Sequence, residues 1–267
     1  MNVWVAIPTD GTRGTLSLCL ASLAIQERLP TGILICENGS RLSMEQDTVV
    51  QMIKFLRASG VQIVMHYCDL PREGFTKLRH HMLQACHSLR AEHVLLLDDD
   101  AMLTTLAFRK LIDVALEHPK FGWVSPVLLY PESLSRTWGA GLDFNWRMLL
   151  RRWSPDDGPE IVLDQCVMAA TTCLLVHLER CLDLGGFDFY QFLPDFAEDR
   201  FFTARFFGRH QTIVHRGAEC YVTSGMANEG KRWKMPVDKL LLREELAKQL
   251  HPSVLEHLRN GKIQSVH

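Results

Sequence analysis

Three consecutive aspartates, Asp98-Asp99-Asp100, follow an apolar run and carry the strongest chemical signal in the sequence. Carboxylates at the end of a buried strand are costly unless a cation neutralises them. Two carboxylates separated by one residue offer the hard oxygens that Mg²⁺ or Mn²⁺ prefers, and they leave positions open for nucleotide phosphates. The alternative is a helix that begins near Ala101, with Asp100 as its cap and solvated acids around it.

A second acidic pair, Glu198-Asp199, precedes an aromatic segment at 200–207 whose spacing predicts a buried helix. We expect both side chains to project from the start of that helix into a cleft. A carboxylate placed there can accept a proton from a bound hydroxyl group. The alternative is an acidic first helical turn that the helix dipole favours without any catalysis.

The elements that must position these acids follow an α/β pattern, because short apolar runs alternate with segments of helical period over the first hundred residues. The predicted strands are Val3–Ile7, Gly32–Cys36, Val61–Tyr67 and His93–Leu97. The predicted helices are 14–28, 44–59, 74–90 and 104–118. The carboxyl ends of the first, second and fourth strands should face one crevice, where a ligand site belongs.

Beyond Pro119 the pattern changes to longer apolar stretches that predict mixed or antiparallel strands on the same sheet. These stretches are Phe121–Tyr130, Trp138–Phe144 and Ile161–Val176. We therefore predict a nucleotide-binding lobe at 1–100, an acceptor and catalytic lobe at 101–225, and a lid loop with a C-terminal helix at 226–267. Trp138, Trp146 and Trp153 in the second lobe either fill the core or stack on sugar rings.

Composition narrows the class of protein. The chain has 267 residues, 47% of them hydrophobic, and a formal net charge of -2, which suits a globular protein and argues against a general nucleic-acid binder. We find neither an apolar run of the roughly 20 residues that a membrane span needs nor the pattern of a signal peptide at the start. The eight cysteines lack C-x-x-C spacing and are expected to be reduced core residues of a cytoplasmic protein.

Several motifs resemble the inverting family 2 of glycosyltransferases, which have the GT-A fold. The triplet Asp98-Asp99-Asp100 is similar to the D-x-D pair of that family. The other partial matches, in the order of the family, are Val5-Ala6-Ile7-Pro8-Thr9, Cys36-Glu37-Asn38-Gly39-Ser40, Gly74 with Arg79, Leu184-Gly185-Gly186-Phe187-Asp188, and Glu198-Asp199. The resemblance implies a Rossmann-like nucleotide-diphospho-sugar transferase fold, with a mostly parallel central sheet flanked by helices and a smaller mixed acceptor lobe.

The resemblance also implies which residues bind the donor. Residues at the ends of the first two strands would hold the base and ribose, and the first two aspartates of the triplet would lie beside them. The implied donor-binding residues are Pro8, Thr9, Asp10, Glu37, Arg79, Asp98 and Asp99. Glu37 stands where the family usually has aspartate. Arg79 would lie near the base or phosphate, the alternative being an exposed helix arginine.

For the metal, Mn²⁺ or Mg²⁺, the resemblance implies Asp100 as a direct ligand, with Asp98 nearer the ribose and a metal-bound water. The family often supplies a third ligand from a histidine, but Tyr221-Val222-Thr223-Ser224 stands about where that histidine would be. His215 is the nearest substitute, because neutral imidazole binds divalent ions. The alternative for His215 is an ordinary residue of the core or its rim.

The resemblance assigns Asp199 as the general base for the acceptor hydroxyl, with Glu198 as its catalytic neighbour. Asp195 is the rival base, and Asp188 is expected to hold a turn. Inversion at the anomeric carbon follows from attack opposite the departing diphosphate. The segment Gly225–Lys234 combines glycines with three cations and predicts a lid over a diphosphate. Its alternative is a basic linker that contacts anionic lipid head groups at the inner face of the membrane.

The predicted reaction moves a sugar from a nucleotide-sugar donor to a hydroxyl of a glycan, lipid-linked sugar or other polymer. UDP is the expected nucleotide, with UDP-galactofuranose and dTDP-rhamnose as candidate donors. Two other classes remain open. One is a nucleotidyltransferase of related fold, which the sequence Gly11-Thr12-Arg13-Gly14 echoes as a phosphate loop. The other is a non-catalytic carbohydrate-binding derivative, which retained buried acids argue against.

Overall fold

A computed structural model describes most of the first 223 residues. The described residues are 1–12, 14–39, 42–70, 75–131, 133–139, 161–163, 168–191, 198–223 and 252. The expected lid at 225–234, the predicted C-terminal helix, Asp195, Trp146 and Trp153 therefore lie outside them.

The first half of the chain builds four parallel strands in the order β3-β2-β1-β4. These strands are β1 (Val3–Thr9), β2 (Gly32–Asn38), β3 (Gln62–Cys68) and β4 (His93–Leu97). The connections hold helices α1 (Thr15–Ala24), α2 (Asp47–Ala58) and α3 (Phe75–Ser88), with the short 3₁₀ helix η1 (Leu42–Glu45) before α2. The predicted strands and helices of this half are confirmed, with ends that differ by a few residues.

The second half extends the same sheet in the order β4-β9-β6-β10-β5, with β7 beside β6 and β8 beside β10. The added strands are β5 (Ala101–Leu103), β6 (Phe121–Tyr130), β7 (Ser133–Gly139), β8 (Ile161–Leu163), β9 (Cys173–His177) and β10 (Gln211–Val222). The helical elements are α4 (Ala107–Glu117), α5 (Leu178–Asp183), η2 (Asp188–Gln191) and α6 (Glu198–Ala204). Strand β9 is antiparallel to both β4 and β6, so the mixed half continues the parallel half in one sheet.

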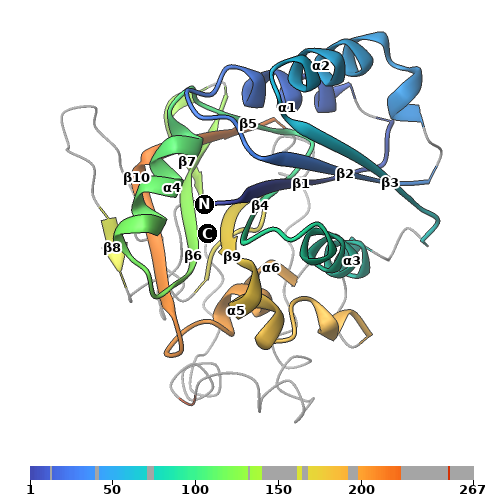
Figure 1. Ribbon diagram of the computed structural model, residues 1–267. Coiled ribbons are helices and arrows are strands. Elements are labelled where there is room, and N and C mark those ends of the chain that lie inside the picture. The colour runs from blue at the N-terminus through green and yellow to red at the C-terminus, as the bar shows by residue number, and fades with distance from the viewer. Residues whose placement is uncertain are drawn as a thin grey trace.

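Helices cover both faces of the sheet (Figure 1). Helices α1, α2 and α4 pack on one face, where alternate strand residues such as Val5 and Leu95 are fully buried. Helices α3, α5 and α6 pack on the other face, against Trp4, Leu96 and their neighbours. Strand residues are therefore apolar at consecutive positions, which is the composition expected of strands covered on both sides.

The residues after the aspartate triplet form a strand. The alternative to a metal site had been a helix that begins near Ala101. Ala101 to Leu103 pair with Val222 to Cys220 as β5, and α4 begins only at Ala107. The interpretation of Asp100 as a helix cap is therefore wrong. A three-residue strand has too little sequence to show a period, and its pairing with β10 decides its conformation.

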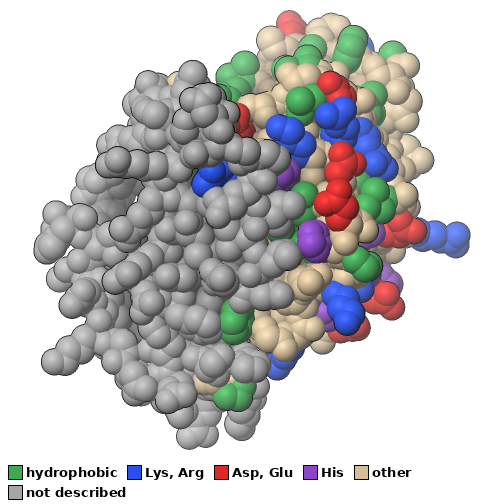
Figure 2. All heavy atoms as spheres, turned by 90° about the vertical axis from the view of Figure 1, so that its left-hand side faces the viewer, with side chains coloured by type: hydrophobic (Ala, Val, Ile, Leu, Met, Phe, Trp, Pro, Cys, Tyr) green, Lys and Arg blue, Asp and Glu red, His purple; other side chains and the backbone are tan. Residues whose placement is uncertain are grey.

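No helix in the described part of the chain is long and apolar enough to cross a membrane. The seven cysteines within the described ranges are free, and most of them are buried, as expected. On the face that forms the left-hand side of Figure 1, the described basic and acidic side chains are interspersed (Figure 2). Arg109 on α4 pairs with Glu27 and lies 3.9 Å from Asp113.

Candidate active site at the carboxyl ends of the parallel strands

The aspartate triplet begins where β4 ends and is held by backbone contacts on both sides. The Asp98 amide donates to the Thr172 carbonyl at 2.8 Å, next to β9. The Asp100 carbonyl accepts from both the amide and the hydroxyl of Thr223, each at 3.0 Å. Asp99 and Asp100 are buried, whereas the Asp98 side chain is 22% exposed. The triplet is thus a fixed turn between two paired strands.

Asp99 connects the triplet to the end of β1. Its Oδ2 accepts a hydrogen bond of 2.7 Å from the hydroxyl of Thr9, and that hydroxyl accepts from the Gly11 amide at 3.1 Å. Both side chains are buried. Asp99 therefore has a structural role between β1 and β4, beside the two outer aspartates.

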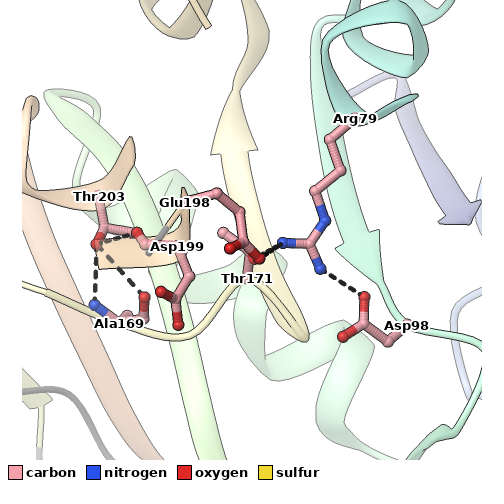
Figure 3. Close-up of polar contacts among 7 residues, drawn as sticks. All are labelled: Arg79, Asp98, Ala169, Thr171, Glu198, Asp199 and Thr203. Atoms are coloured by element: carbon pink, nitrogen blue, oxygen red, sulfur yellow. Dashed lines mark hydrogen bonds and ion pairs between the residues drawn. The ribbon is translucent and has the colours of Figure 1, made fainter. Parts of the chain in front are cut away.

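Arg79 on α3 links the triplet to the second acidic pair. Its Nη2 donates to Asp98 Oδ1 at 2.7 Å, and its Nη1 donates to Glu198 Oε1 at 3.2 Å and to the hydroxyl of Thr171. Figure 3 shows the guanidinium between Asp98 and Glu198. Arg79 is only 3% exposed, so the interpretation as an exposed helix arginine is wrong. Burial opposes its charge, but Asp98 and Glu198 outweigh that penalty and raise the pKa of Arg79.

Helix α6 begins at Glu198, so the prediction that the acidic pair leaves a helix start is confirmed. Glu198 is buried, and burial together with repulsion from Asp199 raises its pKa to about 8 against the attraction of Arg79. The Asp199 carbonyl accepts from the Thr203 hydroxyl at 2.8 Å, and the Ala169 amide donates to the same hydroxyl at 3.1 Å. These bonds attach the first turn of α6 to the segment before β9.

Asp98 and Asp199 lie on the same side of the bridge between Arg79 and Glu198 (Figure 3). Both carboxylates raise the pKa of Arg79 through their charge, which places them within electrostatic reach of one guanidinium. The two acidic motifs, about a hundred residues apart in sequence, thus meet at one end of the sheet.

The end of β2 places Glu37 beside Gly11. Glu37 is 1% exposed, and its Oε1 accepts from the Ser43 amide at 3.1 Å, while its buried Oε2 has no hydrogen-bond partner among the described residues. Gly11 has a φ of +71°, and a Cβ at this position would collide with Glu37 Oε1. An unpaired buried carboxylate oxygen is costly, and a hydrogen-bond donor on a ligand would satisfy it.

The remaining residues expected to bind the donor lie at the end of β1. Pro8 and Thr9 are opposite Cys36 and Glu37 in the parallel register. Asp10 is exposed, and its Oδ1 accepts from the amide and hydroxyl of Thr12 at 2.9 and 2.7 Å. The structure thus brings the ends of β1, β2 and β4 to one edge of the sheet.

His215 lies in β10. It lies opposite Pro126 on β6 and Ile161 on β8. Thr223, eight positions later in the chain, bonds the Asp100 carbonyl. A bulge between His215 and Glu219 shortens this path, so that Pro126 and Leu129, the β6 partners of His215 and Tyr221, are three residues or roughly 10 Å apart along the strand. Ligation of an ion by His215 stays a prediction. Thr223 bonds the Asp100 carbonyl in the stretch where the resemblance implied a histidine.

The residues present fit a divalent ion only in part. Within the described ranges, no group of three or more His, Cys, Asp or Glu side chains is placed to hold a metal. Asp98 and Asp100 nonetheless offer hard carboxylate oxygens at a strand end, and Mg²⁺ is often bound by one or two carboxylates together with substrate phosphates. Such an ion would depend on the donor for the rest of its coordination.

The Gly185-Gly186-Phe187-Asp188 motif lies against α3, where Leu83 and His80 are the side chains nearest to Gly186. Asp188 holds a turn as expected, because its amide donates to the Gly185 carbonyl at 3.0 Å. Arg205 donates to Asp188 Oδ1 and to the Gly186 carbonyl, both at 2.9 Å. Thr171 and Thr203 were not among the predicted site residues. Thr171 bonds Arg79, 92 residues away, and Thr203 bonds Ala169, 34 residues away, so no local spacing marks either of them.

No protein-family model and no curated protein matches the sequence. Solved structures do match. They show that the chain has the mixed α/β nucleotide-diphospho-sugar transferase fold, GT-A. One is Staphylococcus aureus TarS 1-349 in complex with UDP, with 14% identity, a TM-score of 0.60, and coverage of 100% of this chain and 68% of that chain. Another is TarS 1-349 in complex with UDP-GlcNAc, with 16% identity, a TM-score of 0.61, and coverage of 97% and 72%.

Full TarS matches with 13% identity and a TM-score of 0.60 over 100% of this chain and 41% of that chain. At such identities the likeness concerns the fold. The predicted fold class is confirmed.

Proposed function

We propose that this protein is an inverting glycosyltransferase that moves a sugar from a nucleoside-diphosphate donor to an acceptor hydroxyl. The observation that carries the proposal is the convergence of Asp98 and the pair Glu198-Asp199 on Arg79, at the strand edge where ligands bind in α/β folds. The matching TarS structures, with UDP and UDP-GlcNAc, support a UDP-linked donor.

In this proposal the donor lies across the ends of β1, β2 and β4. Pro8, Thr9 and Asp10 line the approach from β1, and the unpaired Glu37 Oε2 can accept a hydrogen bond from the nucleoside. Asp98 and Asp100 would hold Mn²⁺ or Mg²⁺, which when bound neutralises charge on the departing diphosphate. The acceptor is a glycan, lipid-linked sugar or other polymer.

Asp199 is the general base. Its carboxylate accepts the proton of the acceptor hydroxyl while that oxygen forms a bond to the anomeric carbon. The bond from the anomeric carbon to the diphosphate oxygen breaks, and its electron pair leaves with the nucleoside diphosphate. Attack from the face opposite the leaving group inverts the anomeric configuration. The bonds of Thr203 to the Asp199 carbonyl and to Ala169 fix the turn that carries the base.

Donor turnover and donor binding test the proposal separately. The purified protein is incubated with a panel of nucleotide sugars and Mn²⁺, and nucleotide release and thermal stabilisation are measured. We expect UDP release with at least one UDP-sugar. Release of pyrophosphate from a nucleoside triphosphate and sugar phosphate would instead indicate a nucleotidyltransferase.

Two variants assign the roles. Asp199→Asn should keep stabilisation by UDP and lose about 100-fold or more in transfer, the usual range for a general base. Asp100→Ala should lose the stabilisation that depends on Mn²⁺. Asp113→Asn, an exposed aspartate on α4, is the matched control and should retain both. Wild-type transfer rates in Asp199→Asn would contradict the assignment.

A further inference from the structure

Arg79 is enclosed between the two acidic segments of the site. Its guanidinium donates to Asp98 through Nη2 and to Glu198 and Thr171 through Nη1. These partners come from the end of β4, the start of α6 and the segment before β9. A planar guanidinium fixes the relative positions of the groups that it bonds, because its donors point in set directions.

Aromatic rings pack against the buried Arg79 guanidinium. The guanidinium carbon lies 4.4 Å from the centre of the Phe75 ring and 6.0 Å from that of Phe187. With 3% of its surface exposed, Arg79 directs donors at Asp98, Glu198 and Thr171 and presents little surface to a phosphate. The geometry thus differs from the role near the base or phosphate that the family resemblance implies.

We propose that Arg79 is a positioning residue that sets the acid triplet at the end of β4 relative to the base-bearing first turn of α6. The inference rests on the proposed function, since it concerns the distance between the donor side and the base side of that reaction. Misplacing reacting groups by about 1 Å costs on the order of 100-fold in rate. Arg79 therefore governs turnover of the bound donor and leaves donor affinity to other residues.

The decisive measurement is the effect of Arg79→Lys on kcat and on the KM for the donor. Lysine keeps the charge but cannot bridge two carboxylates in a fixed plane. We expect kcat to fall by about 10- to 100-fold, with donor KM and stabilisation by UDP within about threefold of wild type. An increase in donor KM with unchanged kcat would show a donor contact and overturn the inference.

Arg205→Lys is the matched control. Arg205 is also a buried arginine, with its side chain 4% exposed and an ion pair of 2.9 Å to Asp188, but it contacts neither Asp98 nor Glu198 in the described hydrogen bonds. We expect Arg205→Lys to lower stability and to keep kcat within about threefold of wild type. An equal loss of kcat in both variants would mean that any buried arginine has this effect, and would refute a specific role for Arg79.

A thermodynamic cycle tests the bridge without any turnover. Urea unfolding is compared for wild type, Arg79→Lys, Glu198→Gln and the double variant. Substitutions within one hydrogen-bond network have non-additive effects on stability. We therefore expect the unfolding equilibrium constant of the double variant to differ at least about threefold from the value obtained by multiplying the two single effects. Additive effects would refute the bridge. A wild-type protein that turns over no donor refutes the proposed function instead, and the cycle still decides whether Arg79 joins the two segments.

Discussion

Replacing Glu198 with glutamine should stabilise the protein at alkaline pH and not at acidic pH. Glu198 is buried beside Asp199, and its pKa is raised to about 8 although Arg79 is in contact. The ionised carboxylate is therefore unfavourable in the folded state. Glutamine keeps an oxygen that can accept from Arg79 and has no carboxyl proton to lose.

The sign and size follow from proton linkage. The folded protein holds the Glu198 proton more tightly than the unfolded chain does, so its stability falls as the pH rises from about 4.5, the ordinary pKa of a glutamate, to about 8. A pKa shift of this size can change the free energy of unfolding by at most roughly 5 kcal/mol, at about 1.4 kcal/mol per pKa unit. Relaxation of the site and loss of the charged partner of Arg79 reduce the gain, and we expect about 2 kcal/mol.

Urea unfolding of both proteins at about pH 5 and about pH 8.5 measures the effect. The free energies of unfolding of the two proteins should agree within about 0.5 kcal/mol at the lower pH, and the variant should be more stable at the higher pH. Glu117→Gln removes an exposed carboxylate of α4 and serves as the control. A Glu198→Gln variant that is no more stable at about pH 8.5, or equally stabilised at both values, would contradict the reasoning.

Three substitutions test the supports of the site by chemical unfolding. Thr9→Val keeps the side-chain shape but leaves Asp99 Oδ2 and the Gly11 amide without the hydroxyl that bonds both, and it should cost about 2–4 kcal/mol; a neutral effect would show that water replaces the hydroxyl. Gly11→Ala, at a φ of +71° with Glu37 in the way, should cost at least about 1 kcal/mol and weaken UDP stabilisation; unchanged stability would argue against that backbone constraint. Gly185→Ala, at a φ of +89°, should also cost at least about 1 kcal/mol but leave UDP stabilisation unchanged, and a loss of UDP binding would connect this turn to the donor.

The parallel half of the fold could be predicted from sequence because its signals are local. Each of the four strands is a short apolar run, and each of the helices between them has an amphipathic period. Strand β5 could not be predicted, because Ala101 to Leu103 are extended through pairing with β10, more than a hundred residues later. No local pattern gives the register of such a strand.

The acidic motifs of the site could be located from sequence, but the contacts between them could not. Asp98 and Glu198 were found because acids beside apolar runs are unusual. The burial of Arg79 could not be decided from sequence, because an arginine on a helix is usually exposed and this alternative stood beside a place in the crevice. Its partners lie 19 and 119 residues away, and only the completed fold shows that they converge.

The hydrogen bonds of Thr223 to the Asp100 carbonyl span 123 residues of sequence, and this has a consequence for biosynthesis. During translation the triplet leaves the ribosome long before Thr223 does, so the nascent chain cannot close the turn when β4 first forms. The turn that carries the aspartate triplet is therefore completed late, after β10 has inserted between β6 and β5. Chains that terminate before this strand carry every aspartate of the triplet but not the partner that fixes it in place.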